Sequence, residues 1–235
     1  MKARINSFQS MGAVDGPGIR FVTFLQGCPL RCAYCHNPET WDLCGGDEYS
    51  VEEVLQKTMR YRPYFRDGGG ITVSGGEPLL QPGFISELFR RLKEEGVHTA
   101  LDTSGSGDPA GAEEVLMHTD HVLCDLKFPT EEGYRQYCKG SLQQVLSFLE
   151  ITERLRIPLW IRHVVVPGLT DSEEMIKEII RIARRYSNLE KIEWLPFKKI
   201  CSAKYDALGV PFPLADYSEC PEETIRRLNN LSYPE

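Results

Sequence analysis

Residues 27–41 read GCPLRCAYCHNPETW, and the fold and chemistry of the chain can be worked out from this stretch outward. Its thiols stand at Cys28, Cys32 and Cys35, in the spacing C-x3-C-x2-C. Pro29 and the surrounding small residues are typical of a loop rather than a helix. Closely spaced thiolates on a loop suit zinc or an iron–sulfur cluster, because soft metals prefer sulfur and a nearby metal ion lowers the thiol pKa. The stretch therefore predicts a metal-binding loop.

Two kinds of metal site fit three cysteines. A structural zinc site needs a fourth protein ligand, usually from a second pair of cysteines or histidines, and no such pair follows. His36 directly follows Cys35, which makes it difficult for both to close one tetrahedron. A 4Fe-4S cluster held by three cysteines instead keeps one iron open for a substrate or cofactor. We favour the cluster, with a closed zinc site or unrelated thiols as the alternatives.

The flanking residues carry a family resemblance. With Tyr34 between the last two cysteines, the loop resembles the C-x3-C-x-aromatic-C signature of the radical S-adenosylmethionine (SAM) enzymes. The runs VDGPGIR at 14–20, CHNP at 35–38 and TWD at 40–42 are similar to the glycyl-radical-enzyme activases within that family. The similarity continues in pieces to about Gly209. It implies a partial barrel, SAM bound at the open iron, and a 4Fe-4S cluster held by Cys28, Cys32 and Cys35.

Length and composition set limits on the rest. The chain has 235 residues, of which 41% are hydrophobic, enough to bury a sizeable core as a single domain over 1–235. The formal charge of −7 disfavours nucleic acid and anionic membranes as partners. No run of about 18 apolar residues is present, and the N-terminus lacks the apolar core of a signal peptide. We therefore expect a cytoplasmic protein.

The cysteines outside the loop do not form a pattern of their own. The chain is too long, and its eight cysteines too unevenly spread, for a disulfide scaffold. No segment rich in C-x2-C pairs is present, so we expect no inserted ferredoxin-like domain. We expect separate buried or half-buried thiols at Cys44, Cys124, Cys138, Cys201 and Cys220.

The rest of the chain alternates strand-like and helix-like runs. Apolar and β-branched runs predict strands at 18–26, 71–73, 99–101, 122–124, 159–166 and 192–195. Helical spacing predicts helices between a Ser50 cap and Pro63, at 83–95, 112–117 and 131–156, and from about 171 and 221. Such alternation predicts an α/β fold with a parallel sheet and right-handed crossovers. Six repeats give a partial (β/α)6 barrel if the sheet curls, or an open doubly wound sheet if it does not.

Polar residues at the ends of these strands favour the barrel. Barrel active sites are built at the carboxyl ends of the strands. The chain places there the cysteine loop, Gly75-Gly76-Glu77, Asp102, Asp125, Lys127 and Arg162. The family resemblance implies the same radical SAM type of partial barrel.

The run Gly75-Gly76-Glu77-Pro78 follows a strand and has two interpretations. It can be a turn that joins strand to helix. Alternatively, the glycines let a ligand approach the backbone while the carboxylate receives an ammonium group. The resemblance implies the second role, with Gly75, Gly76 and Glu77 binding the amino group of SAM.

Asp102 and Asp125 end neighbouring strands. Each can cap the helix that follows, but two carboxylates converging on one site repel each other unless a cation lies between them. The resemblance suggests a monovalent cation held by Asp102, Thr103, the Leu123 carbonyl and Asp125.

Arg162 lies within an apolar strand, where a charge is costly without a partner. It can form a buried ion pair, for example with Glu193, while the resemblance implies that it faces the cofactor. His163 alternates to the opposite face and is left out of the site. The resemblance adds Tyr34, His36, Lys127 and Phe128 to the cofactor-binding residues.

Two further positions concern the cofactor and the partner. Where the family often has Leu-Pro-Tyr/Phe-His, this chain has Leu195-Pro196-Phe197-Lys198. Lys198 can donate to a ribose hydroxyl or a carboxylate, but it cannot act as a neutral acceptor. Asp15, which otherwise suits a turn, belongs to a segment that the family uses to hold the partner's glycine loop.

The resemblance implies an activase for a glycyl radical enzyme. The expected partners are pyruvate formate-lyase as the favoured glycyl radical enzyme and flavodoxin or ferredoxin as electron donor, and we expect a monomer that works in anaerobic metabolism. The alternatives are a radical SAM enzyme acting on a small molecule, against which the Asp-Gly-Pro-Gly and Cys-His-Asn-Pro runs weigh, and a non-catalytic zinc-binding protein.

Overall fold

One mixed sheet organises the chain. The structure, a computed structural model, describes residues 1–232. The strands are β1 (Lys2–Gly12), β2 (Arg20–Leu25), β3 (Asp47–Ser50), β4 (Gly70–Gly75), β5 (His98–Thr103), β6 (His121–Asp125), β7 (Leu159–Val165) and β8 (Leu189–Pro196). They lie in the order β3-β1-β2-β4-β5-β6-β7-β8. β2, β4, β5, β6, β7 and β8 pair in parallel, whereas β1 pairs antiparallel with β2 and β3.

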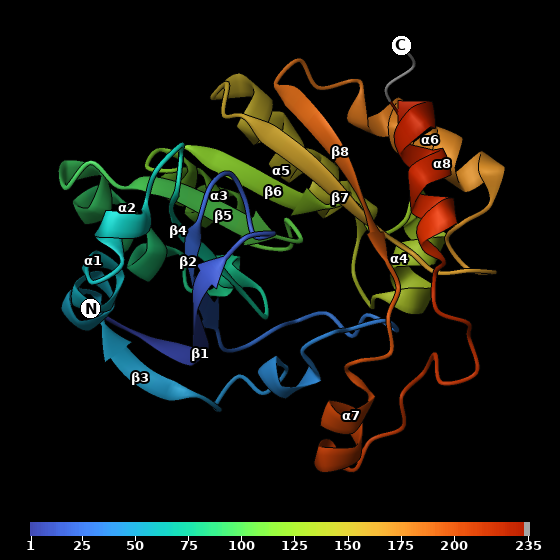
Figure 1. Cartoon of the computed structure of the whole chain (residues 1–235), viewed down its shortest axis with the longest axis horizontal. Helices are drawn as coiled ribbons and strands as arrows, with labels where there is room; N and C mark the ends of the chain where they lie inside the picture. Colours follow the sequence, from blue (N-terminus) through green and yellow to red (C-terminus); the bar gives the residue numbers. More distant parts are fainter. Residues whose placement is uncertain (233–235) are drawn as a thin grey trace.

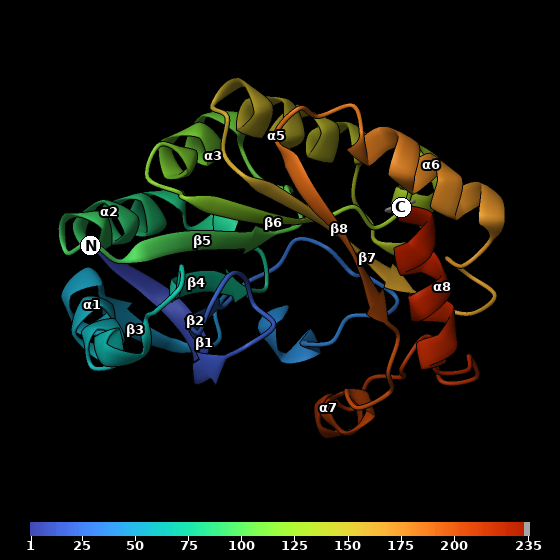
Figure 2. The same ribbon diagram turned by 45° about the horizontal axis from the view of Figure 1, so that its top comes forward.

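The six parallel strands are the six that the sequence predicts, and the sheet curls without closing, because β3 and β8 form its two edges. Figure 2 shows the sheet as an arc with helices along its convex side. The partial barrel is therefore confirmed, and the open doubly wound sheet is excluded.

The helices are α1 (Val51–Met59), α2 (Pro82–Glu94), α3 (Pro109–Leu116), α4 (Glu131–Tyr137), α5 (Leu142–Arg154), α6 (Glu173–Ala183), α7 (Ser202–Leu208) and α8 (Glu222–Ser232). Short 3-10 turns occupy Pro38–Thr40, Arg62–Tyr64 and Pro78–Leu80. The Ser50 cap is present as a capping box with Glu53, as its spacing predicts. None of the helices within 1–232 is long and apolar enough to cross a membrane.

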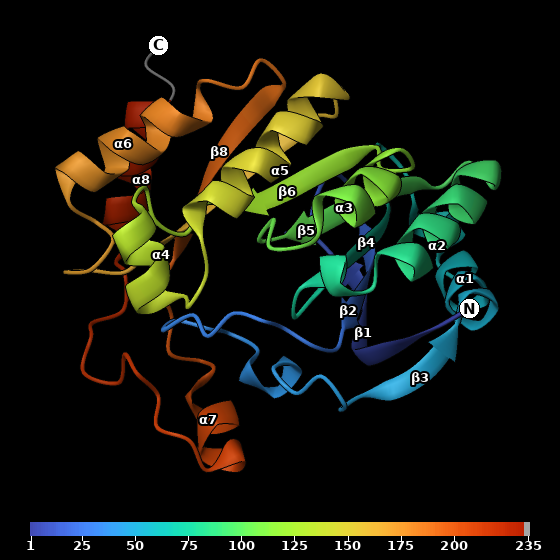
Figure 3. The same cartoon turned by 180° about the vertical axis from the view of Figure 1, so that it is seen from behind.

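Four elements differ from the sequence-based prediction. The predicted helix over 131–156 is two helices, because Lys139 takes a left-handed backbone conformation (φ 56°) after the end of α4. β1 and β3 were not predicted, since their buried and exposed residues do not alternate regularly. α7 was not predicted either. It lies apart from the sheet, near the 3-10 turn Pro38–Thr40 (Figures 1 and 3).

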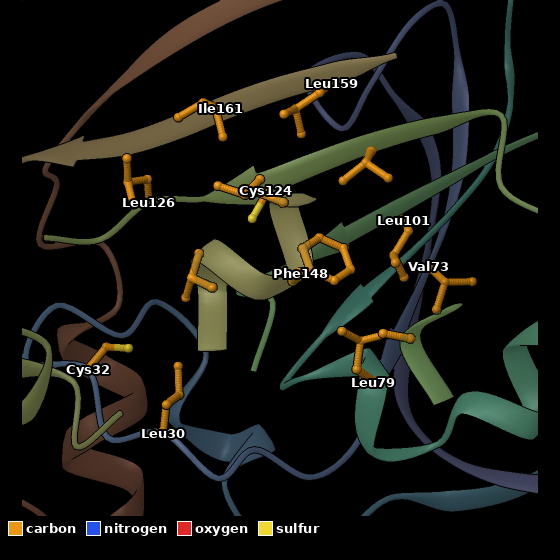
Figure 4. Close-up of a cluster of buried hydrophobic side chains, with 14 of the residues drawn as sticks. Leu30, Cys32, Val73, Leu79, Leu101, Cys124, Leu126, Phe148, Leu159 and Ile161 are labelled. Atoms are coloured by element: carbon orange, nitrogen blue, oxygen red, sulfur yellow. The ribbon is translucent and has the colours of Figure 1, made fainter. Parts of the chain in front are cut away.

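The core lies between the sheet and the outer helices and reaches the cysteine loop. Figure 4 shows side chains from β4, β5, β6 and β7 with Phe148 of α5. Leu30 and Cys32 of the cysteine loop belong to the same buried cluster. The loop is therefore packed into the core on one side, which holds it against the end of the sheet.

Candidate active site

The carboxyl ends of the parallel strands surround a cavity of about 220 Å³. A wider cleft of about 760 Å³ shares Tyr34, His36, Asp102 and Arg162 with it and extends between β1 and β8. The predicted residues that line the inner cavity are Cys28, Cys32, Tyr34, Cys35, His36, Gly75, Gly76, Asp102, Thr103, Asp125, Lys127 and Arg162. Residues from five separate chain segments thus meet where the sequence places them.

Hydrogen bonds from two other parts of the chain hold the cysteine loop: the backbone at the end of α4, and α7. The amides of Arg31 and Ala33 donate to the carbonyls of Cys138 and Tyr137, both at 2.8 Å. The Tyr205 hydroxyl of α7 donates to the Cys35 carbonyl at 3.1 Å. These contacts fix the direction in which the three thiols point.

The thiols differ in their environment. Burial raises the pKa of Cys28 and of Cys35 to about 12. A hydrogen bond with the Cys138 thiol lowers the pKa of Cys32 to about 7, against the effect of burial. Burial makes bare thiolates unfavourable at Cys28 and Cys35, whereas a bound metal would replace their protons.

The donor set fits a cluster better than a single ion. All three thiols line one cavity, yet within the described residues no three His, Cys, Asp or Glu side chains are arranged to share one metal ion. A mononuclear zinc site requires such an arrangement. In an iron–sulfur cluster each thiolate binds a different iron, so the sulfurs need not converge on one point. The zinc alternative therefore lacks its ligand geometry here.

Gly75 and Gly76 allow the end of β4 to lie directly against the start of the cysteine loop. Gly75 has a positive φ of 123°, and a Cβ on Gly76 would collide with the Gly27 carbonyl. The Glu77 amide donates to that same carbonyl at 2.8 Å. The two glycines therefore have a structural role in joining strand and loop, and their backbone also borders the cavity.

The Glu77 carboxylate points away from the cavity. It is fully buried, and each oxygen accepts two hydrogen bonds: one oxygen from Thr103 (2.5 Å) and the Leu79 amide (3.0 Å), the other from the amide (2.9 Å) and hydroxyl of Ser104. Burial raises its pKa despite these donors. The carboxylate is therefore already bound by four protein donors, and its predicted role in receiving the ammonium group of SAM stays a prediction.

Opposite the thiols lie two ion pairs. Asp102 meets Arg162 at 3.0 Å and accepts from the Ser74 hydroxyl at 2.7 Å. Asp125 meets Lys127 at 2.8 Å. Burial disfavours the charge on Lys127, but Asp125 raises its pKa well above the ordinary value; burial likewise acts against Asp125, while Lys127 and Arg162 lower its pKa. The cavity therefore presents cations and carboxylates side by side, as an amino-acid zwitterion requires.

These pairs change the reasoning for a monovalent cation. The two carboxylates were expected to repel each other unless a cation lay between them, and Arg162 and Lys127 supply positive charge from the protein itself. The Thr103 hydroxyl donates to Glu77, and Leu123 is not among the cavity-lining residues. The electrostatic reason for a bound cation is therefore absent from the described residues.

Three other predicted positions lie outside the inner cavity. Phe128 is buried and stacks on Tyr137, and its assignment to cofactor binding stays a prediction. Lys198 lines the wider cleft and approaches Glu219 at 3.7 Å. Asp15 lines the same cleft, where burial and the Asp102 charge raise its pKa.

Several residues of the site were missed by sequence reasoning. Ser74 and Ser104 bind the key carboxylates, and the Lys204 ammonium reaches Asn37 (2.7 Å) and Glu39 (2.6 Å) of the cysteine loop. His163, which the sequence-based prediction left out, has a buried ring with Nδ1 2.8 Å from the Leu126 carbonyl. Ser74 and Ser104 directly flank recognised motifs, which is the signal that could have found them. The contacts of α7 had no such signal.

Comparisons with known proteins find matches over the part of the chain that contains the site. The family model described as "Radical SAM superfamily" matches residues 22–182. The pyruvate formate-lyase-activating enzyme of Clostridium pasteurianum is 46% identical over 226 residues, covering 96% of this chain and 94% of that protein. The pyruvate formate-lyase 1-activating enzyme of Escherichia coli K12 is 41% identical, covering 97% and 94%.

Solved structures match the fold. A radical SAM methyltransferase from Sphaerobacter thermophilus superimposes with a TM-score of 0.65 at 15% identity, covering 98% of this chain and 74% of that one. A domain of the pyruvate-formate lyase-activating enzyme from Bacteroides vulgatus gives 0.57 at 22% identity, covering 70% and 92%. At these identities the likeness concerns the fold alone.

Proposed function

The chain belongs to the Radical SAM superfamily, and on that premise we propose that it activates a glycyl radical enzyme, with pyruvate formate-lyase as the favoured partner. The observation that carries the proposal is the cavity in which three thiols of one loop face two carboxylate–cation pairs. A metal ligand set and a zwitterion-binding set in one small cavity suit SAM, whose methionine part is an amino acid. Relatives at 39–46% identity carry the name of this activity.

Each group of residues has a defined task. Cys28, Cys32 and Cys35 would hold a 4Fe-4S cluster. When bound, the reduced cluster supplies the electron that splits SAM into methionine and a 5'-deoxyadenosyl radical, which takes a hydrogen atom from a glycine of the partner. The chain itself would bind and orient SAM and would exclude water from the cavity.

The polar side of the cavity would bind the amino and carboxyl groups of SAM. Asp102 and the backbone of Gly75 and Gly76 would bind the ammonium group, and Arg162 and Lys127 would bind the carboxylate; all five residues line the cavity. Because each cation already contacts an aspartate, both are held in place before the ligand arrives. Tyr34 and His36 border the cavity and the cleft together and would contact the remainder of SAM.

The wider cleft would admit the glycine loop of the partner. It begins at the inner cavity, ends at the surface, and carries Asp15 and Lys198 on its walls. Lys198, at the outer end, would meet the ribose of SAM or the partner's backbone rather than the methionine part.

The proposal includes a flavodoxin or ferredoxin as electron donor and a monomer in the anaerobic cytoplasm. A monovalent cation near Asp102 and Asp125 is a secondary part of it, supported by the family resemblance alone. Replacing potassium by choline in the assay buffer tests it: a lower rate of SAM cleavage would support the cation, and an unchanged rate would remove it.

Electron paramagnetic resonance tests the function directly. The reconstituted, reduced protein is mixed anaerobically with SAM and pyruvate formate-lyase, and a doublet from a glycyl radical is expected. A sample without SAM is the control. Release of 5'-deoxyadenosine without a radical on any glycyl radical enzyme would contradict the activase and favour a small-molecule substrate.

A further inference from the structure

A fourth cysteine lies directly behind the thiol loop. Cys138 follows the end of α4 and is fully buried. Backbone hydrogen bonds on either side of Cys32, from Arg31 to Cys138 and from Ala33 to Tyr137, fix the two segments beside each other. Cys32 and Cys138 belong to the same buried cluster, and the Cys138 thiol is the neighbour that most strongly affects the pKa of Cys32. The pair is therefore set by the fold and not by a chance rotamer.

The two sulfurs differ in access. Cys32 lines the cavity, whereas Cys138 does not line it and is fully buried. A small reagent that enters the cavity would meet Cys32 first. Cys138 is then in position to attack the modified Cys32 from behind, which is the arrangement of an attacking and a resolving cysteine.

We propose that Cys32 and Cys138 form a disulfide in the cluster-free protein, and that this bond prevents cluster assembly until it is reduced. The second half of the proposal rests on the function proposed above, in which Cys32 is a cluster ligand. With the cluster in place the Cys32 sulfur is bound to iron and cannot pair. Oxidation therefore acts on the empty loop alone and protects Cys32 from irreversible oxidation.

The reaction consumes one small-molecule disulfide. The Cys32 thiolate attacks one sulfur of the reagent, breaking its S–S bond and releasing one thiolate. The Cys138 thiolate then attacks the Cys32 sulfur and releases the second thiolate. The two protein thiols lose two electrons and two protons, and the reagent becomes two thiols. The backbone hydrogen bonds on either side of Cys32 already hold the two cysteines next to each other, so their sulfurs need only approach for this bond.

The test is disulfide mapping of the cluster-free protein after anaerobic incubation with oxidised glutathione. Mass spectrometry of a non-reduced digest should find a Cys32–Cys138 crosslink in most chains, with a loss of two hydrogens. C138S should keep glutathione on Cys32, and C44S, which changes an exposed cysteine, should crosslink like the unmodified protein. Pairing of Cys32 with Cys28 or Cys35, or a lasting glutathione adduct in the unmodified protein, would overturn the proposal.

The same treatment of the reconstituted protein separates this proposal from the proposed function. No Cys32–Cys138 crosslink should form there while the iron content is unchanged. A crosslink alongside intact iron would show that Cys32 is not a ligand and would contradict the cluster assignment. The absence of a crosslink in the cluster-free protein would contradict the disulfide alone.

Discussion

Two arginines inside the barrel, at opposite ends of the strands, differ in how their charge is used. Arg20, at the amino end of β2, is fully buried and donates to Thr72 (2.9 Å), Gly68 (2.9 Å), Pro17 (3.1 Å) and the Ile71 carbonyl. None of these partners is a carboxylate, and burial lowers the pKa of Arg20 to about 10. Its hydrogen bonds connect the loop between β1 and β2 to the start of β4.

Arg162, toward the carboxyl end of β7, faces the cavity. It pairs with Asp102 at 3.0 Å and lies 3.6 Å from Glu193. Burial opposes its charge, but Asp102 and Asp125 raise its pKa. Its Nε has no hydrogen-bond partner in the described structure. The comparison teaches that a buried arginine surrounded by backbone and hydroxyl acceptors holds the fold, whereas one that lines a cavity and pairs with a carboxylate there lies beside a ligand site.

The largest effect is expected at the structural arginine. Arg20→Met leaves four acceptors without their donor, two of them buried and two part-buried, and each buried one costs about 1 to 3 kcal/mol. We expect the free energy of unfolding to fall by about 3 kcal/mol or more, measured by urea denaturation of the cluster-free protein. Arg90→Met, at an exposed helix position, should change it by less than about 0.5 kcal/mol. Equal effects of the two substitutions would remove the distinction between the two ends.

The cavity arginine should affect ligand binding more than stability. Arg162→Met removes a charge-assisted hydrogen bond to the SAM carboxylate, a loss of about 1.5 to 3 kcal/mol, so affinity for SAM should fall by about 10- to 100-fold. Calorimetric titration of the oxidised, reconstituted protein measures this. In this variant Asp102 can take up a proton or bind water from the cavity. The free energy of unfolding should therefore fall less than in Arg20→Met. Arg154→Met, on an exposed pair with Glu113, is the control. Unaltered affinity for SAM would contradict the assignment of Arg162.

The amino end of the barrel should also determine the acid sensitivity. Burial, with the charges of neighbouring groups, lowers the pKa of His121 to about 4. A protonated ring would form only a weak ion pair with Glu190, which lies 3.9 Å away. In the unfolded chain the His121 ring binds a proton below its ordinary pKa of about 6.5, whereas in the folded chain it stays neutral until about pH 4. The contribution of His121 to the free energy of unfolding is therefore fully present above pH 6.5 and is lost toward pH 4. The loss at pH 5 is about 1 to 2 kcal/mol.

Urea denaturation of the cluster-free protein at pH 7.5 and pH 5 measures this loss. His121→Asn should reduce the difference between the two pH values, whereas His118→Asn, in the turn after α3, should leave the difference unchanged. A difference that is the same in all three proteins would assign the acid sensitivity elsewhere.

The smallest effect is expected at α7, which supports the cysteine loop from outside the barrel. Tyr205→Phe removes one hydrogen bond to the Cys35 carbonyl, about 1 kcal/mol. Iron should leave the reconstituted protein about fivefold faster in the presence of a chelator. Tyr64→Phe, at an exposed position, should not change this rate. A chelation rate unaffected by Tyr205→Phe would show that α7 does not stabilise the loop.

Most of the fold could be predicted from sequence because its strands are buried on both faces. β4, β5 and β6 are short apolar runs that end on glycine or aspartate, and each was found within a few residues. β1 and β3 have mixed exposure and no clear period, so nothing local indicates a strand. Their place is determined by pairing with β2, which is a tertiary property.

The site was predictable where a residue type and its chemistry agree. The thiols, Asp102, Asp125, Lys127 and Arg162 all reach the cavity. Glu77 and Phe128 do not, because adjacency to a motif does not give the direction of a side chain. The Glu77 carboxylate is enclosed by Thr103 and Ser104, from the end of the next strand and the residue after it. Only the three-dimensional arrangement of β4 and β5 shows this.

The measurement that tests the central claim most directly is iron content together with SAM cleavage in four single variants. C28A, C32A and C35A are reconstituted anaerobically beside C44A, in which an exposed cysteine outside the cavity is removed. The account predicts about four irons and release of 5'-deoxyadenosine for C44A, and no reductive cleavage of SAM for the other three. Undiminished cleavage in any one of C28A, C32A or C35A would contradict it.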